Sequence, residues 1–126
     1  MKVTNLDKSL EFYVGKLGLS EKFRLLDKTG KPWLVYIQIA EGQFIELFPN
    51  ASDSFQRSTN AGYVHVSLEV DDIDDVFEKL SAKGVTISKP LIMAVDRARQ
   101  FWIEDPDGNP IEIQQFTEDS MEVKGY

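Results

Sequence analysis

QFIELF (43–48) and PIEIQQF (110–116) decide the fold, because they are two versions of one pattern. In each, a glutamate lies between two large aliphatic residues in a β-rich run, and Glu46 overlays Glu112 at an offset of 66. A pattern that returns at a fixed spacing is the signature of an internal repeat. We therefore interpret the chain as two copies of one structural unit.

Each copy contains one expected helix. Apolar residues recur at helical spacing in TNLDKSLEFYVGKLG (4–18) and in DDIDDVFEKLSAKG (71–84), and a glycine ends each stretch. These patterns predict helices near 6–17 and 73–83.

Short β-rich runs account for the rest of each copy. The alternation in VHVSLEV (64–70) is typical of a strand with one buried face, and its last residue, Val70, overlays Val3 at an offset of 67. Asp105-Pro106-Asp107-Gly108 is a strong turn sequence. Further strands are expected at GLSEKF (18–23), LVYIQIA (34–40), GVTISK (84–89) and ARQFWIE (98–104).

The order of a strand, a helix and further strands in each copy predicts an α+β fold. We expect tandem βαβββ modules that form a curved, cup-shaped mixed sheet with the helices outside. Residues 1–126 form one domain in this interpretation. It divides into module one (1–50), a polar linker (51–62), module two (63–116) and an exposed acidic tail (117–126).

The composition excludes several classes of partner. Charged residues make up 28% of the 126 residues, and the net charge is -7 with scattered acidic residues, which argues against nucleic acid or an anionic membrane. No apolar run approaches the roughly 18 residues that span a bilayer. Cysteine is absent, so a reducing cytoplasm is the expected location. Neither nucleic acid nor a membrane is therefore expected as a partner.

Glu46, Glu112 and the single histidine, His65, are the candidate metal ligands. Side chains alternate between the faces of a strand, so each of the three points away from its strand's apolar stripe. On a flat sheet such side chains simply face solvent, which is the ordinary interpretation. On a curled sheet they face the cavity, where imidazole and carboxylates suit one divalent ion: Ni²⁺, Zn²⁺, Co²⁺, Mn²⁺ or Fe²⁺.

Four stretches match one known family: VTNLDKSLEFYVGKLGL, QFIELFP, YVHVSLEVDDID and IEDPDGNPIEI. They resemble the vicinal oxygen chelate superfamily, which includes glyoxalase I, bleomycin- and fosfomycin-resistance proteins, extradiol dioxygenases and methylmalonyl-CoA epimerase. The resemblance covers residues 1–116 and is more specific for the fold than for the reaction. It implies paired βαβββ modules, with two chains usually completing each metal site in the small members, so we expect a homodimer.

The resemblance implies that Glu46, His65 and Glu112 are three of four metal ligands. The fourth would be the counterpart of His65 in module one, which the offset places three residues upstream of Met1. We expect the native protein to begin earlier, because MKVTNLD enters in mid-strand. If the first strand is genuinely short, three protein ligands and a water would hold the ion.

Glyoxalase I-type chemistry fits this ligand set best. The resemblance implies a metal-dependent lyase or isomerase that acts on a small hydroxy-carbonyl or thiol-adduct substrate through an enediolate. The metal acts there as a Lewis acid and a ligating glutamate moves the proton, with Glu112 the first candidate base and Glu46 the second. One histidine is too few for an extradiol dioxygenase. The alternative is a metal-independent small-molecule or antibiotic-binding protein, as in bleomycin resistance.

Arg97 and Arg99 are the candidate substrate-binding residues. They lie where module two is expected to line the cup, and a guanidinium group binds carboxylates well. A solvated loop is an equally ordinary interpretation of this segment. Aromatic residues such as Tyr36, Phe44 and Trp102 are candidates for an apolar pocket wall, although most aromatic residues should be core.

Overall fold

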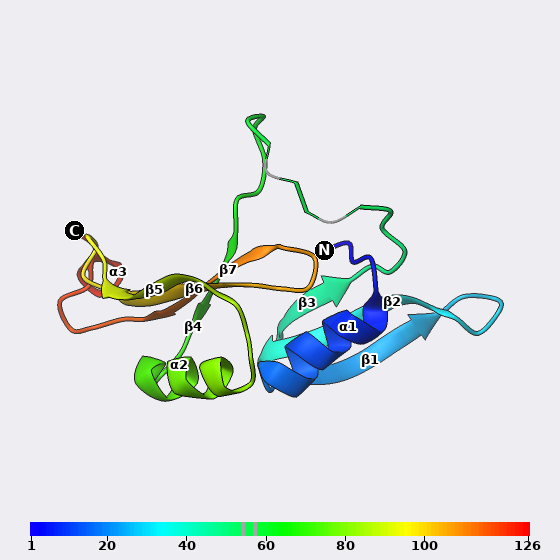
Figure 1. The fold of residues 1–126 in the computed structure, drawn as a ribbon, viewed down its shortest axis with the longest axis horizontal. Coiled ribbons are helices and arrows are strands. Elements are labelled where there is room, and N and C mark those ends of the chain that lie inside the picture. The colour runs from blue at the N-terminus through cyan, green and yellow to red at the C-terminus, as the bar shows by residue number, and fades with distance from the viewer. Residues whose placement is uncertain (54, 57) are drawn as a thin grey trace. The chain divides into compact units, whose positions relative to one another are not determined.

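The computed structural model describes residues 1–53, 55, 56 and 58–126, which form two compact units, Met1–Gln56 and Arg57–Tyr126 (Figure 1). Each unit contains a helical segment and a sheet, which confirms the predicted α+β fold of βαβββ-type modules. The expected linker falls partly on residues 54 and 57, which lie outside the described residues. None of the helices in the described part is long and apolar enough to cross a membrane.

The first unit is a three-stranded antiparallel sheet with one helical segment. The sheet has the order β1-β2-β3, and the residues before the helix add a parallel bridge between Lys2 and Phe48. The elements are α1 (Leu6–Leu10), the π-helical segment η1 (Glu11–Lys16), β1 (Ser20–Leu26), β2 (Pro32–Ala40) and β3 (Gln43–Leu47).

The helix predicted near 6–17 forms, but only its first part is α-helical. Asn5 caps it, because its side chain accepts a hydrogen bond from the backbone N–H of Lys8 at 3.0 Å. From Glu11 the winding widens, and the N–H of Leu17 donates to the carbonyl of Phe12 at 2.9 Å. This segment buries Tyr13, whose exposed fraction is 0%.

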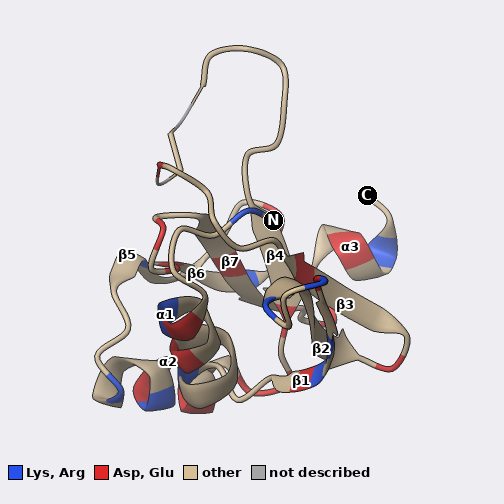
Figure 2. Cartoon of the chain, turned by 90° about the vertical axis from the view of Figure 1, so that its right-hand side faces the viewer, with Lys and Arg blue, Asp and Glu red and all other residues tan. Residues whose placement is uncertain are grey.

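The second unit repeats this plan with one more strand. Its sheet has the order β4-β7-β6-β5, in which β4 and β7 are parallel and the other pairs are antiparallel. The elements are β4 (Val66–Glu69), α2 (Ile73–Ala82), β5 (Ile87–Met93), β6 (Arg99–Glu104), β7 (Pro110–Gln115) and the short helix α3 (Met121–Lys124). Acidic and basic residues are interspersed along α2 and α3 (Figure 2).

Equivalent backbone hydrogen bonds in the two units support the predicted repeat. The N–H of Val3 donates to the carbonyl of Phe48 at 2.9 Å, and the N–H of Val70 donates to the carbonyl of Gln114 at 2.8 Å. The offset in the sequence is 67 between the two donors and 66 between the two acceptors. The offsets of 67 and 66 that the sequence predicts are therefore the same as the offsets between equivalent hydrogen-bonded residues of the two units.

The start of β4 differs from the sequence prediction. The strand begins at Val66 and not at Val64, whose exposed fraction is 64%. Hydrogen bonds between parallel strands recur every two residues. Counting back from the bond between Val70 and Gln114, the carbonyl of Val64 would need the N–H of residue 110. That residue is Pro110, which has no N–H, so the ladder ends.

The tail is exposed over residues 121–126, but it is not free of the rest of the second unit. The N–H of Met121 donates to the carbonyl of Asp96 at 2.8 Å, and the Thr117 hydroxyl donates to the carbonyl of Arg97 at 2.9 Å. Ser120 is fully buried. The sequence predicts a uniformly exposed tail, and Glu118, Asp119 and residues 121–126 are indeed exposed, whereas Thr117 is half-buried and Ser120 is buried.

Candidate metal centre

The turn between β6 and β7 sets the register that positions Glu112. The carboxylate of Asp105 accepts hydrogen bonds from the N–H of Asp107 at 2.9 Å and of Asn109 at 2.8 Å. This closes the turn predicted at residues 105–108. The two strands then pair without a bulge, with Trp102 directly opposite Glu112.

Glu112 lies on the face of β7 that is turned away from α2. Its neighbours Ile111 and Ile113 are 0% and 2% exposed and face the core, as the alternation predicts. The carboxylate of Glu112 meets the imidazole of His65, with 3.5 Å between Nε2 and Oε2. The side chains are 31% exposed for His65 and 14% for Glu112, so the pair is partly covered. Two of the three predicted ligands therefore lie together.

The geometry of this pair suits a shared cation. Two ligand atoms at roughly 2.1 Å from a tetrahedral ion are about 3.4 Å apart, and the observed separation is 3.5 Å. The other ring nitrogen, Nδ1 of His65, is buried and has no hydrogen-bond partner among the described residues. A buried polar atom of that kind needs a partner. The fit to a divalent ion rests on the separation of Nε2 and Oε2, since Nδ1 lies on the other side of the ring. Within neither unit do three described His, Asp or Glu side chains gather.

Trp102 forms one wall beside the pair. Its ring centroid lies 4.5 Å from that of His65, at an interplanar angle of 54°. The indole Nε1–H donates to the side-chain oxygen of Gln100 at 2.8 Å, which holds the ring in place. The ammonium of Lys89 lies 4.0 Å from the centre of the same ring. The face of the second unit therefore combines a carboxylate, an imidazole, an indole and a cation.

Glu46, in the first unit, is held by a tyrosine. Tyr36 on β2 pairs directly with Glu46 on β3, and its hydroxyl donates a hydrogen bond to the Glu46 carboxylate. This bond, followed by burial and the carboxylate charge, raises the pKa of Tyr36. Phe23 stacks on Tyr36 with 4.3 Å between centroids and an angle of 21°, and Phe44 contacts it edge-on at 5.9 Å. The Met1 ammonium donates to the Glu46 carbonyl at 2.7 Å.

The two glutamates have equivalent surroundings in the repeat. Each is the last member of a row across three strands, and corresponding members of the two rows share the offset of 66. In both rows an aromatic residue lies beside the glutamate. The residue at the far end of the row is aromatic in the first unit and cationic in the second. The rows are Phe23, Tyr36 and Glu46 on β1, β2 and β3, and Lys89, Trp102 and Glu112 on β5, β6 and β7.

The two arginines predicted to bind substrate lie elsewhere. The guanidinium group of Arg99 makes two hydrogen bonds to the carboxylate of Asp74 on α2, at 2.7 and 2.8 Å. Arg99 and Glu112 thus lie on opposite faces of the sheet. Arg97 is exposed in the turn between β5 and β6, with a φ of 66°. Lys89 was not among the predicted site residues, but its offset of 66 from Phe23 is a signal that identifies it.

A comparison with known protein families decides the identity of the fold. The profile of the glyoxalase/bleomycin resistance protein/dioxygenase superfamily matches residues 1–113. The chain belongs to this superfamily. The resemblance inferred from the sequence, to the vicinal oxygen chelate proteins, is thereby confirmed.

Members of the superfamily with known names or structures support the assignment. A probable lactoylglutathione lyase of Synechocystis is 32% identical over 124 residues, covering 91% of this chain and 90% of that protein. A glyoxalase family protein from Enterococcus faecalis shares the fold, with a TM-score of 0.75, 22% identity and 90% of each chain covered. The fosfomycin resistance protein of Listeria monocytogenes, solved with Mn(II) and sulfate, has a TM-score of 0.70 at 24% identity, covering 95% and 90%.

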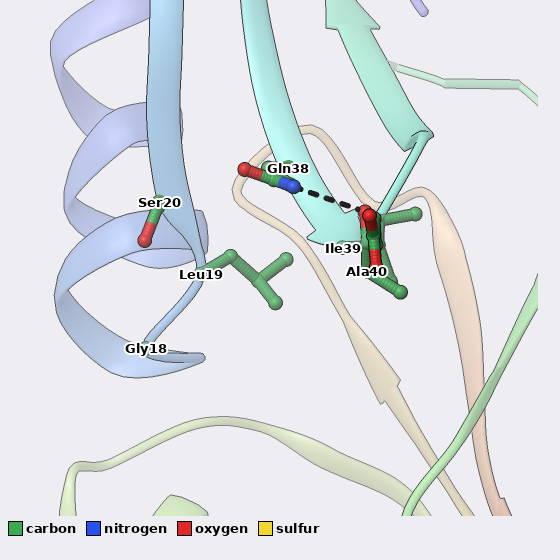
Figure 3. A pocket seen from close by; sticks show the side chains of 7 residues that line it. Gly18, Leu19, Ser20, Gln38, Ile39 and Ala40 are labelled. Carbon is green, nitrogen blue, oxygen red and sulfur yellow. Dashed lines mark hydrogen bonds between the residues drawn. The ribbon is translucent and has the colours of Figure 1, made fainter.

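The first unit of this superfamily member also has a shallow hollow of about 290 Å³ (Figure 3). It lies where η1 leads into β1 and beside the turn from β2 to β3. The side-chain amide of Gln38 donates to the carbonyl of Ala40 at 3.2 Å within it. None of the predicted site residues lines it; the lining residues are Gly18, Leu19, Ser20, Gln38, Ile39, Ala40 and Glu41.

Proposed function

We propose that this superfamily member is a metal-dependent lyase or isomerase of the glyoxalase I type, acting on a small hydroxy-carbonyl or thiol-adduct substrate. The observation that carries the proposal is the distance of 3.5 Å between Nε2 of His65 and Oε2 of Glu112. A nitrogen and an oxygen donor are thereby brought together on a partly covered face. The 32% identity to a probable lactoylglutathione lyase supports the same class of reaction.

His65 and Glu112 are the proposed ligands from the second unit, and Glu46 is the third on the strength of its repeat position. Nitrogen and carboxylate donors suit Ni²⁺, Zn²⁺, Co²⁺, Mn²⁺ or Fe²⁺. When bound, such an ion polarises the oxygens of a hydroxy-carbonyl group and makes the neighbouring C–H more acidic. One ion per site is expected.

Glu112 is the proposed base. In its ionised form, the carboxylate accepts a proton from the hydroxyl-bearing carbon next to the substrate carbonyl and returns it to the former carbonyl carbon, while the hydroxyl proton passes to the former carbonyl oxygen. Glu46 is less suited to this task, because the Tyr36 hydroxyl hydrogen-bonds to its carboxylate and stabilises one position. The imidazole of His65 borders the same carboxylate, and the Trp102 ring lies beside that imidazole.

A homodimer is part of the proposal. The edge strand β1 leaves Phe23, Leu25 and Leu26 exposed at 45%, 39% and 55%. On β5, an edge strand of the second sheet, Ile92 and Met93 are 52% and 59% exposed. Apolar edge strands favour pairing with another chain, and closed dimers are the commonest assembly.

The test is to measure metal and activity together. The chain is dialysed against each candidate ion, its metal content is measured by mass spectrometry, and isomerisation of the hemithioacetal of methylglyoxal and glutathione is followed. We expect turnover that rises with metal content and stops on chelation, and Glu112→Gln should abolish it. A chain that binds the hemithioacetal equally well before and after chelation, without turnover, would instead be the metal-independent binding protein.

A further inference from the structure

Lys89 is placed on the same face as His65 and Glu112 by strand pairing. It lies on β5 directly opposite Trp102 on β6, and Trp102 lies directly opposite Glu112 on β7. The Lys89 ammonium sits over the indole, 4.0 Å from the ring centre. Three neighbouring strands therefore carry a cation, an aromatic wall and the carboxylate of the candidate centre in one row.

The ammonium of Lys89 has an aromatic partner in place of an acidic one. No carboxylate of the described residues lies within 4.0 Å of it, whereas Arg24, Arg99 and Lys79 each have an acidic partner within 2.7 Å. A cation over an aromatic ring at an exposed site gains only about 0.5–1 kcal/mol. The charge of Lys89 is thus held in place by Trp102 and is still available to an anion.

The distance to the candidate centre limits the size of that anion. The centroid of the Trp102 ring is 4.5 Å from that of the imidazole, and the Lys89 Nζ is 4.0 Å from the indole ring. The distance from the Lys89 ammonium to the His65 ring therefore cannot exceed the sum of these two distances. A chain of a few carbon atoms is long enough to cover it. The indole Nε1–H already donates to Gln100, so Lys89 supplies the one cation in this row.

We propose that Lys89 and Trp102 form an anion subsite, and that the substrate carries a carboxylate at the end remote from its reacting hydroxy-carbonyl group. This inference rests on the proposed function, which assigns the reacting end to His65 and Glu112. A single ammonium matches the single charge of a carboxylate, whereas a phosphate dianion is usually held by several donors. The carboxylate belongs either to a small oxo acid, in which a few carbon atoms separate it from the hydroxy-carbonyl group, or to a peptide thiol adduct.

The experiment compares charged and neutral ligands of the same shape. 5-Hydroxy-4-oxopentanoate, its neutral carboxamide, and S-methylglutathione are titrated into the metal-loaded chain by calorimetry. The variants are Lys89→Gln, Lys89→Arg and, as a matched control, Lys79→Gln, whose ammonium pairs with Asp75 on α2. Metal content is measured for every protein.

We expect the wild type to bind 5-hydroxy-4-oxopentanoate at least tenfold more tightly than its carboxamide. Lys89→Gln should remove that preference while leaving the affinity for the carboxamide and the metal content unchanged. Lys89→Arg should retain part of the preference, and Lys79→Gln all of it. Dependence on Lys89 for S-methylglutathione alone would identify the peptide adduct as the source of the carboxylate.

Two outcomes separate this inference from the proposed function. Retained binding of metal and of the carboxamide, with the same preference for 5-hydroxy-4-oxopentanoate in Lys89→Gln as in the wild type, would overturn the subsite and leave the proposed function intact. If neither the wild type nor any variant binds metal, but the preference for carboxylates still depends on Lys89, the proposed function is overturned and the subsite is supported. Absence of any carboxylate preference in the wild type would also overturn the subsite.

Discussion

The hydroxyl of Tyr36 and the carboxylate of Glu46 face each other across β2 and β3 and share a hydrogen bond. Stacking against Phe23 restricts the Tyr36 ring, so the hydroxyl is held where the carboxylate needs it. Side chains that orient a ligand in this way typically change metal affinity about 10–100-fold when they are altered. Tyr36 is therefore a positioning residue for Glu46 in the proposed centre.

Tyr36→Phe should lower the affinity for the divalent ion roughly 10–100-fold, because it removes the hydrogen bond and keeps the ring that packs on Phe23. Competition with a chelator of known affinity measures the change. Tyr126→Phe is the control, since Tyr126 is 78% exposed. Equal metal affinity in wild type and Tyr36→Phe would show that the bond does not serve the metal.

His65→Ala should release more metal than any substitution of an arginine, because His65 supplies the single imidazole of the chain. Mass spectrometry after dialysis gives the retained metal for wild type, His65→Ala and the control Arg97→Ala. Arg97 is exposed in the turn between β5 and β6. If His65→Ala and wild type retain the metal equally, the ion binds elsewhere.

Mixing two inactive variants tests the proposed homodimer. Glu46→Gln and His65→Ala each damage one module. If module one of one copy completes a site with module two of another, random mixed dimers should recover about one quarter of the sites. Metal content and turnover of the mixture provide the measurement. No recovery, together with a monomer in light scattering, would contradict a site completed by two chains.

The ion pair between Asp74 and Arg99 makes the second unit sensitive to acid. The hydrogen bond from Arg99 keeps the pKa of Asp74 below its usual value. This contribution to stability is present above the ordinary aspartate pKa of about 3.9 and is lost as the pH falls through the lower folded-state pKa. Urea unfolding of wild type and Asp74→Asn should therefore differ at pH 6 and converge at lower pH. A constant difference across that range would refute the assignment.

Phe101 anchors the contact between the sheet of the second unit and α2. It is fully buried and meets Phe77 edge-on at 5.1 Å. Phe101→Ala should reduce the free energy of unfolding by about 3–5 kcal/mol, measured by chemical denaturation. Val95→Ala, at a residue that is 98% exposed, should change it by less than about 0.5 kcal/mol. A small loss for Phe101→Ala would mean that the core rearranges to fill the space.

The sequence by itself determined the repeat, both principal helical segments and the faces on which Glu46 and Glu112 lie. These features depend on local periodicity: two residues for a strand, about 3.6 for a helix, and a constant offset between the copies. Ile45 and Ile111 are accordingly buried, as their positions in alternating runs predict.

Only the tertiary structure decided which side chains meet. Arg99 pairs with Asp74, which is distant in the sequence, and Lys89 covers Trp102 because register shifts between β5 and β6 on both sides of Lys89 bring the two residues opposite each other. The missing N–H of Pro110 ends β4 before Val64, an effect that requires knowing which strand lies beside it. Alternation along a strand specifies the face of a residue, but contacts across strands depend on register, and one residue of slip moves every side chain to the opposite face.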